Sequence, residues 1–178
     1  MNPLPTIVHL GNPILRNIAQ PLDFPLDEKI LKLVKILTAT AIAHQGVGIA
    51  APQISQSYRL FIVASHKSDR YPHAPKMQPT AMLNPQIISH SDEIVKDWEG
   101  CLSVPNVRGL VPRYRSIEVK YNTIAAETKQ ITLSDFVARI FQHELDHLNG
   151  IVFTDRVETE AELYTEAEYR KIINKSVS

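Results

Sequence analysis

The residues best suited to chemistry lie together near the carboxyl end of the chain, in the segment His143-Glu144-Leu145-Asp146-His147. Two histidines four positions apart project from one face of a helix, about one turn from each other, so both can bind a single metal ion. A glutamate between them can act on a water held by such an ion. The segment therefore predicts a metal-dependent hydrolytic site on a helix.

The predicted surroundings of Glu144 strengthen this interpretation. With residues spaced at about 100° around a helix, Glu144 falls between Val137 and Ile140, in the middle of an apolar face. An unpartnered buried carboxylate costs several kcal/mol, so folding alone would rarely place one there. The same projection puts His143 and His147 at the edge of the apolar face. One isolated histidine there would be an ordinary core residue with hydrogen-bond partners, but the pair with its glutamate favours metal binding.

The remaining polar residues of this helix are predicted to face away from the core: Arg139, Gln142, Asp146 and Asn149.

A third ligand is available in Cys101, the only cysteine of the chain. Gly100 precedes it and Pro105 follows, which predicts a constrained loop or strand edge that can present a thiolate to the helix. Two imidazoles and one thiolate leave a fourth tetrahedral position for water, as in catalytic metal sites. Two alternatives stay open, a small buried hydrophobic residue and a nucleophile with His143 as its base. Neither of them accounts for Glu144.

A third segment is rich in small residues and reads Gly46-Val47-Gly48-Ile49-Ala50-Ala51-Pro52-Gln53. Small residues let a backbone come close to a ligand, and the amide N–H of Gln53 can stabilise a developing oxyanion. The alternative is a purely structural role, in which the glycines form the turn after a helix. The segment lacks the preceding strand of a dinucleotide or phosphate loop.

Three helices and several short strands are predicted to position these residues. Helical spacing of apolar residues predicts a helix over 26–43. Ser134 as N-cap and Gly150 as stop bound a second helix over 136–148, which carries the two histidines. The acidic tail 158–174 predicts a peripheral helix. The predicted strands span 60–64, 82–88, 109–111, 116–121 and 129–133. Antiparallel strands around a central metal-binding helix, with an N-terminal and a C-terminal helix, give an α+β fold.

Composition restricts the organisation and the partners. The 178 residues include 19 Lys and Arg against 19 Asp and Glu, and 44% are hydrophobic, which predicts a single catalytic domain over 1–178 with 156–178 as a peripheral tail. Lys and Arg form no basic run, so we expect no specific binding to nucleic acid. No apolar stretch is long enough to span a membrane. Residues 1–5 do not resemble a signal peptide, and a lone cysteine suits a reducing compartment, so we expect a cytoplasmic protein.

Taken together, the three segments resemble the peptide deformylase family. The family pattern G-x-G-x-A-A-x-Q, then E-G-C-L-S, then Q-H-E-x-D-H, matches residues 46–53, 99–103 and 142–147 in that order. The resemblance extends from residues 10–16, through 83–85, to Arg108 and Asp155. It therefore covers nearly the whole chain.

This resemblance implies a role for each matching residue. The metal ligands would be Cys101, His143 and His147, with Glu144 as general base and acid. Gln53 and the backbone N–H of Leu102 would hold the formyl oxygen. Substrate contacts would come from Gly46, Val47, Gly48 and Ile140, with Val47 and Ile140 lining an apolar pocket for the methionine side chain. Gln142 and Asp146, on the polar side of the helix, would support the ligands or the fold.

The resemblance also implies a cofactor, a substrate and a partner. The family uses one divalent metal ion, Fe(2+), with zinc, nickel or cobalt able to take its place, and the donor set alone does not choose among them. The substrates would be nascent formylated polypeptides, met at the ribosome. Two departures, Trp98 before Glu99 and the glycine-less turn at 122–127, concern substrate fit and loop shape. A zinc endopeptidase and a non-catalytic metal-binding domain remain as alternatives.

Overall fold

The computed structural model describes residues 4–68 and 71–175, and it confirms the α+β class. Two antiparallel sheets are present in these ranges, one with the order β1-β2-β3-β6-β7 and one with the order β4-β5-β8. The helices are α1 (Glu28–Ala43), α2 (Asp135–Leu148) and α3 (Glu166–Lys175). The strands are β1 (Gly48–Ala50), β2 (Leu60–Val63), β3 (Thr80–His90), β4 (Ile94–Cys101), β5 (Val104–Tyr114), β6 (Ser116–Asn122), β7 (Thr128–Ser134) and β8 (Leu163–Thr165).

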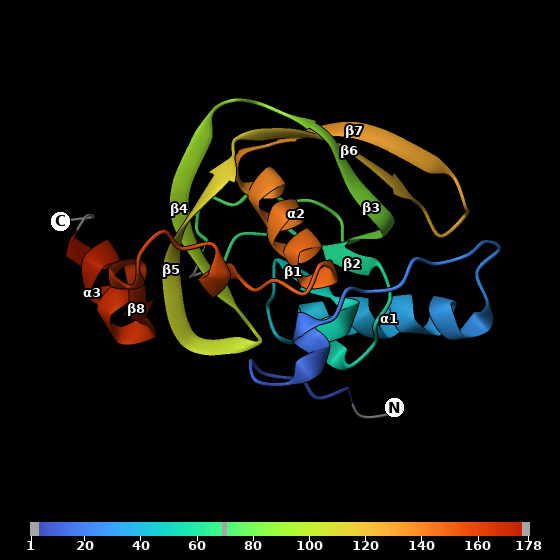
Figure 1. The fold of residues 1–178 in the computed structure, drawn as a ribbon, viewed down its shortest axis with the longest axis horizontal. Coiled ribbons are helices and arrows are strands. Elements are labelled where there is room, and N and C mark those ends of the chain that lie inside the picture. Colours follow the sequence, from blue (N-terminus) through green and yellow to red (C-terminus); the bar gives the residue numbers. More distant parts are fainter. Residues whose placement is uncertain (1–3, 69–70, 176–178) are drawn as a thin grey trace.

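Helix α2 runs through the middle of the molecule, with β4 and β5 on one side and the larger sheet on the other (Figure 1). All four residues of strand β2 are buried. Since alternate residues of a strand point to opposite sides of the sheet, both faces of β2 are covered. Its Leu60 and Ile62 pack in the cluster that contains α1, whereas Phe61 packs in the cluster that contains α2. The rings of Phe61 and Phe141 meet edge to face, with centroids 5.1 Å apart. Packing in the core therefore holds α2 in a defined position.

The two predicted long helices are present, with slightly different starts. Helix α1 begins after Asp27, whose side chain accepts a hydrogen bond of 2.8 Å from the backbone N–H of Ile30. Ser134 stands at the N-cap position of α2, but its side chain makes no capping hydrogen bond. Past the end of α2, Gly150 has a φ of 73°, as predicted for a helix stop.

The carboxyl-terminal prediction is wrong in its first half. A helix was expected over 158–174, but α3 begins only at Glu166. Strand β8 precedes it and pairs with β5. Pairing with a strand edge outweighs the weak helical pattern of this stretch, because it satisfies backbone groups that a short exposed helix would leave to water.

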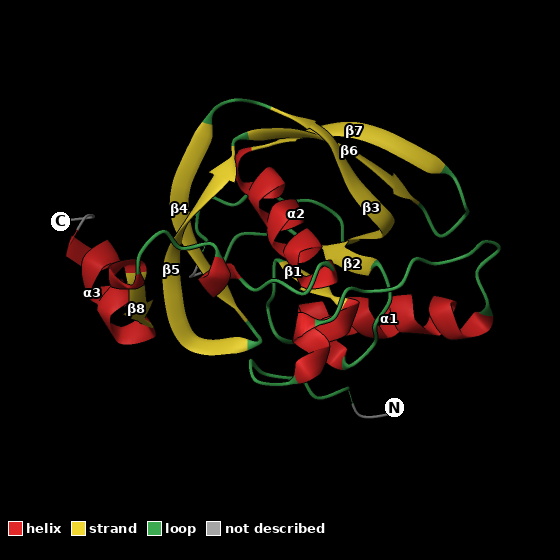
Figure 2. Cartoon of the chain, in the orientation of Figure 1, coloured by secondary structure: helices red, strands yellow, loops and turns green. Residues whose placement is uncertain are grey.

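The small sheet and the first strand were largely missed by the sequence-based predictions. Strands β1, β4 and β8 were not predicted at all, and β5 is longer than the expected 109–111. Figure 2 shows β4 and β5 as long curved ribbons beside α2. Their apolar alternation is broken by charged residues that turn out to be buried, which hides the strand pattern in the sequence.

No helix in the described ranges is long and apolar enough to cross a membrane. Residues 1–3 and 176–178 lie outside the described residues. They belong to the segments for which we made predictions about a signal peptide (1–5) and about a peripheral tail (156–178).

Candidate active site

Two elements bring the predicted metal ligands together. His143 and His147 project from α2, and Cys101 ends β4. One ligand atom from each of these residues lies within 4.8 Å of the others, and Cys101 Sγ is 3.2 Å from His147 Nε2. A thiolate and two imidazoles at this spacing fit a tetrahedral divalent ion with one position left for water or substrate. The donor set thus has the chemistry and the closeness that a metal site requires.

The protonation of Cys101 also suits a ligand. Burial alone would raise the pKa of this thiol, but the neighbouring imidazoles of His147 and His143 bring the pKa well below its ordinary range. The thiolate is the form that binds metals. His147 Nδ1 is buried and has no hydrogen-bond partner in the described part of the chain. The His147 imidazole is therefore buried, close to a half-buried thiolate, and not fully satisfied by hydrogen bonds to the described residues.

Glu144 lies beside the ligands and is 4% exposed. Its Oε2 has no hydrogen-bond partner among the described residues, and burial raises its pKa to about 7. Gly48 on β1 makes room for it, because a Cβ atom there would be 2.9 Å from both Cγ and Cδ of Glu144. A carboxyl group with a pKa near neutrality can both take and give a proton.

Gln53 is fixed by hydrogen bonds at both ends of its amide. Its Oε1 accepts a hydrogen bond of 2.8 Å from the backbone N–H of Ala50, which sets the amide orientation. Its Nε2 then donates to Ser103 Oγ at 3.2 Å and to Cys101 Sγ at 3.4 Å. The donor side of the Gln53 amide is thereby directed toward the end of β4, next to Leu102.

A cavity of about 290 Å³ joins these groups. The residues predicted to be catalytic, substrate-binding or metal-ligating line it, except His147, which is buried: Gly46, Val47, Gly48, Gln53, Cys101, Leu102, Ile140, His143 and Glu144. Trp98, one of the two departures, also lines it, whereas the turn at 122–127 does not. In that turn Ala126 adopts a φ of 63°, the conformation in which a glycine is usual.

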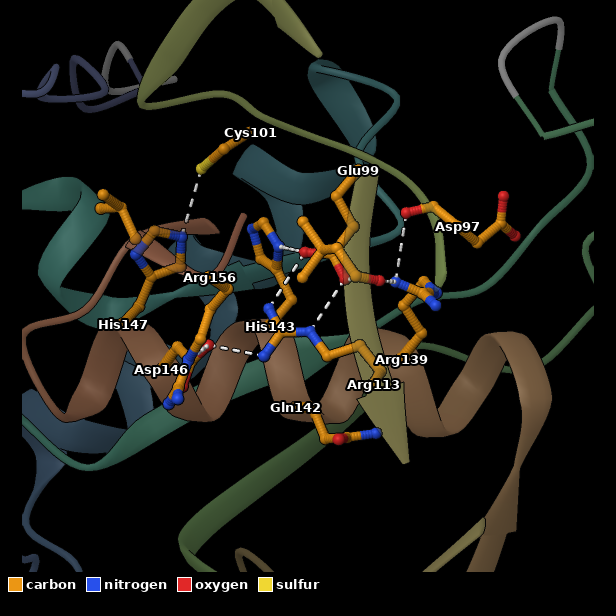
Figure 3. A network of polar contacts seen from close by, with 12 residues as sticks. Asp97, Glu99, Cys101, Arg113, Arg139, Gln142, His143, Asp146, His147 and Arg156 are labelled. Atoms are coloured by element: carbon orange, nitrogen blue, oxygen red, sulfur yellow. Dashed lines mark hydrogen bonds and ion pairs between the residues drawn. The ribbon is translucent and has the colours of Figure 1, made fainter. Parts of the chain in front are cut away.

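Glu99 is a candidate site residue that was not predicted. Its Oε2 lies 2.8 Å from His143 Nδ1, which leaves the other ring nitrogen of His143 for a metal (Figure 3). The same carboxylate binds Arg113 through two hydrogen bonds of 2.9 and 3.0 Å, and Arg139 at 2.8 Å. Burial would raise the pKa of Glu99, but Arg113 and His143 hold it well below its usual range. A carboxylate in this position orients a ligating histidine and raises its basicity.

A signal for Glu99 was present in the sequence. Alternate residues of a strand point to the same side, so Glu99 and Cys101 on β4 both face α2. Glu99 was not predicted as a site residue because residues 99–101 were not assigned to a strand.

The predicted solvent face of α2 is wrong for three of its four residues. Arg139, Gln142 and Asp146 are buried, at 6%, 6% and 5% exposed. The sheet of β4 and β5 covers this side and supplies charged partners, such as Arg113, which donates to Asp146 at 2.6 Å (Figure 3). Gln142 exchanges two hydrogen bonds with the backbone of Tyr114 on β5. Gln142 and Asp146 therefore contact β5 through buried hydrogen bonds instead of facing solvent.

Comparison with known proteins finds one family over most of the chain. The family model described as polypeptide deformylase matches residues 4–162. Peptide deformylase 2 of Nostoc sp. is 55% identical over 177 residues, which cover 99% of each chain. Peptide deformylase 2 of Shewanella oneidensis is 43% identical over 155 residues, covering 86% of this chain and 84% of the relative.

Solved structures agree with the sequence relatives. The class I type b peptide deformylase from Acinetobacter baumannii, bound to Met-Ala-Ser, superposes with a TM-score of 0.86 at 42% identity and covers 88% of this chain and 100% of its own. The peptide deformylase from Thermotoga maritima gives a TM-score of 0.79 at 34% identity, over 89% of this chain and 100% of its own.

Proposed function

This chain belongs to the peptide deformylase family, and we propose how its own residues carry out the family's reaction. The protein is a metal-dependent hydrolase that removes the N-formyl group from the amino-terminal methionine of newly made polypeptides. The observation that supports the assignment of roles is the convergence of Cys101, His143 and His147 beside the unpartnered carboxylate of Glu144 in one cavity. Family membership removes the endopeptidase and non-catalytic alternatives.

Cys101, His143 and His147 would hold one divalent ion. When bound, the ion supplies a Lewis acid that polarises the formyl carbonyl and lowers the pKa of water. Fe(2+) is our assignment, by resemblance to the family, and zinc, nickel and cobalt suit the same donors. Elemental analysis of protein purified without oxygen tests it. About one equivalent of iron supports the assignment, and zinc or another metal in its place overturns it.

Glu144 would move the proton. As a base it takes a proton from the attacking water, and as an acid it returns this proton to the departing amine, with formate as the other product. Its burial and its pKa of about 7 suit both steps at neutral pH. Glu99 does not touch the reacting atoms and acts as a positioning residue through His143.

Gln53 and Leu102 would hold the formyl oxygen. The amide group of Gln53 is already oriented by Ala50, so it needs little reorganisation to donate to an oxyanion, and the backbone N–H of Leu102 would complete the pair. Val47 and Ile140 would line the apolar pocket for the methionine side chain, while Gly46 pairs with the peptide backbone. Gly48 would contribute mainly by leaving space for Glu144.

The expected partners and compartment follow from the substrate. Formylated nascent chains emerge from the ribosome, so we infer that the protein meets them there, in the cytoplasm. A formal net charge of zero supports an encounter that does not depend on specific nucleic-acid binding.

The decisive experiment is formate release from formyl-Met-Ala-Ser, with and without a chelator, by the parent and by Glu144→Gln. We expect the variant to keep the parental metal content and to lose about 10²- to 10⁴-fold in kcat, because a general acid–base contributes about that much. Near-parental formate release by the variant would remove Glu144 from the mechanism. Activity that persists in the presence of the chelator would show that the reaction does not depend on the metal.

A further inference from the structure

The carboxyl-terminal helix α3 forms part of the wall of the substrate cavity. Glu166 and Arg170, one turn apart on α3, line the same cavity as Cys101 and Glu144. Both lie beyond residue 162, where the match to the family model ends. This wall is thus contributed by a part of the chain outside the matched family region.

Aromatic contacts hold α3 against the small sheet. The ring of Trp98 on β4 meets the rings of Tyr164 and Tyr169 edge to face, with centroids 5.0 and 4.9 Å away. Strand β8, directly before α3, pairs with β5. Two independent attachments therefore fix the position of Glu166 and Arg170 relative to the cavity.

An ion-pair network joins α3 to the cavity. Arg108 Nε on β5 donates to Glu166 Oε2 at 2.6 Å, and Arg170 Nε donates to Glu166 Oε1 at 3.3 Å. Arg108 is buried against the backbone next to Cys101, since a Cβ atom on Gly100 would be 2.7 Å from its Cζ. Burial would raise the pKa of Glu166, but Arg108 lowers it below the usual range. Glu166 is thus ionised at neutral pH, and two arginines share one carboxylate.

The charges at this end of the cavity do not balance. Among the residues of β5 and α3 that line the cavity, two arginines, Arg108 and Arg170, against one glutamate, Glu166, leave one positive charge. The side chain of Arg170 is 68% exposed, and its ion pair with Glu166 is long, at 3.3 Å, so the guanidinium is accessible to a bound peptide. Because Arg108 and Arg170 line the same cavity as Glu144, they are available to a peptide whose formylated end is bound there.

We propose that α3 selects substrates by charge, with Arg108 and Arg170 favouring an acidic side chain over a basic one at one of the two residues that follow the formylated methionine. The proposal rests on the deformylase function set out above. It makes Glu166 a regulator of specificity, because its carboxylate decides how much of the arginine charge remains for the substrate.

The test compares kcat/KM for carboxyl-amidated peptides, formyl-Met-X-Ser and formyl-Met-Ala-X, in which X is Asp or Lys. Amidation removes the terminal charge. In the parent we expect an Asp-to-Lys ratio of about threefold at one of these positions, the usual scale for partly exposed charges. Arg170→Glu should bring the ratio below one, and Glu166→Gln should raise it. Lys171→Glu makes the same charge change as Arg170→Glu one residue away, outside the cavity lining, and should leave the ratio at the parental value.

The outcomes separate this proposal from the proposed function. Failure to release formate from any peptide would overturn the deformylase function itself. Formate release with an Asp-to-Lys ratio near one at both positions, or equal shifts in Arg170→Glu and Lys171→Glu, would overturn the selection by α3. A true charge preference also shrinks in 0.5 M salt, where the Debye length falls to about 4 Å. A ratio that salt leaves unchanged would count against it.

Discussion

The contact between Gly48 and Glu144 makes the substitution Gly48→Ala a sharp test of the site. A Cβ atom on Gly48 would lie 2.9 Å from Cγ and Cδ of Glu144. Carbon atoms prefer about 3.5 Å or more, so the glutamate must retreat by about 0.6 Å or further. Because Glu144 is buried, its carboxylate has little free space to enter. A misplacement near 1 Å costs about 10²-fold in rate, so we expect kcat/KM to fall by about that factor.

The assay is formate release from formyl-Met-Ala-Ser, together with metal content and urea unfolding. Crowding alone should cost about 1 to 3 kcal/mol of stability. Gly11→Ala is the control, because alanine rarely adopts the φ of 104° found there, yet its Cβ would meet no atom within 4 Å and Gly11 does not line the cavity. We expect the control to lose stability and to keep its activity.

A double-mutant cycle tests whether Gly48→Ala lowers activity by displacing Glu144. If Gly48→Ala acts through the position of Glu144, it should reduce the residual activity of Glu144→Gln very little, since the group that it displaces no longer works. Full multiplicative losses in the double variant, or near-parental activity of Gly48→Ala, would refute the reasoning.

Three further predictions concern the ligands and their support. Cys101→Ser should bind metal much more weakly than the parent, because a neutral hydroxyl replaces a charged soft ligand; normal metal content with no activity would instead make Cys101 a nucleophile. Glu99→Gln should lower metal affinity about 10- to 100-fold through His143 and cost about 3 to 5 kcal/mol of stability by leaving buried arginines without their counter-charge, both measured by metal titration and urea unfolding; parental metal affinity would disprove the positioning role. Burial would raise the pKa of Asp155, but its bonds to Arg16 lower it, so the pair stabilises the fold above about pH 3.9 and is lost as the pH falls further. The free-energy difference between the parent and Asp155→Asn should therefore shrink in acid, and a difference constant from pH 7 to pH 3 would contradict this.

The local periodicity of the sequence was enough to predict the central helix and its chemistry. The spacing of His143, Glu144 and His147 is a property of one helical turn, and the apolar residues beside them set which face is buried. The lone Cys101 and the Gly46–Gln53 segment could be joined to the helix by chemistry and family resemblance, without knowing their distance in space. Local pattern therefore pointed to the groups that we propose to react.

Tertiary structure alone decided what surrounds those groups. A helical projection cannot show that a second sheet covers the polar side of α2, so the burial of Arg139 and Asp146 depended on counter-charges brought from distant strands. Pairing of β8 with β5 overrode the helical pattern of the tail and carried Glu166 to the cavity wall. The sequence determined which residues share a face, because that depends on neighbours along the chain. What packs on that face depends on contacts between distant segments, and these exist only in the folded protein.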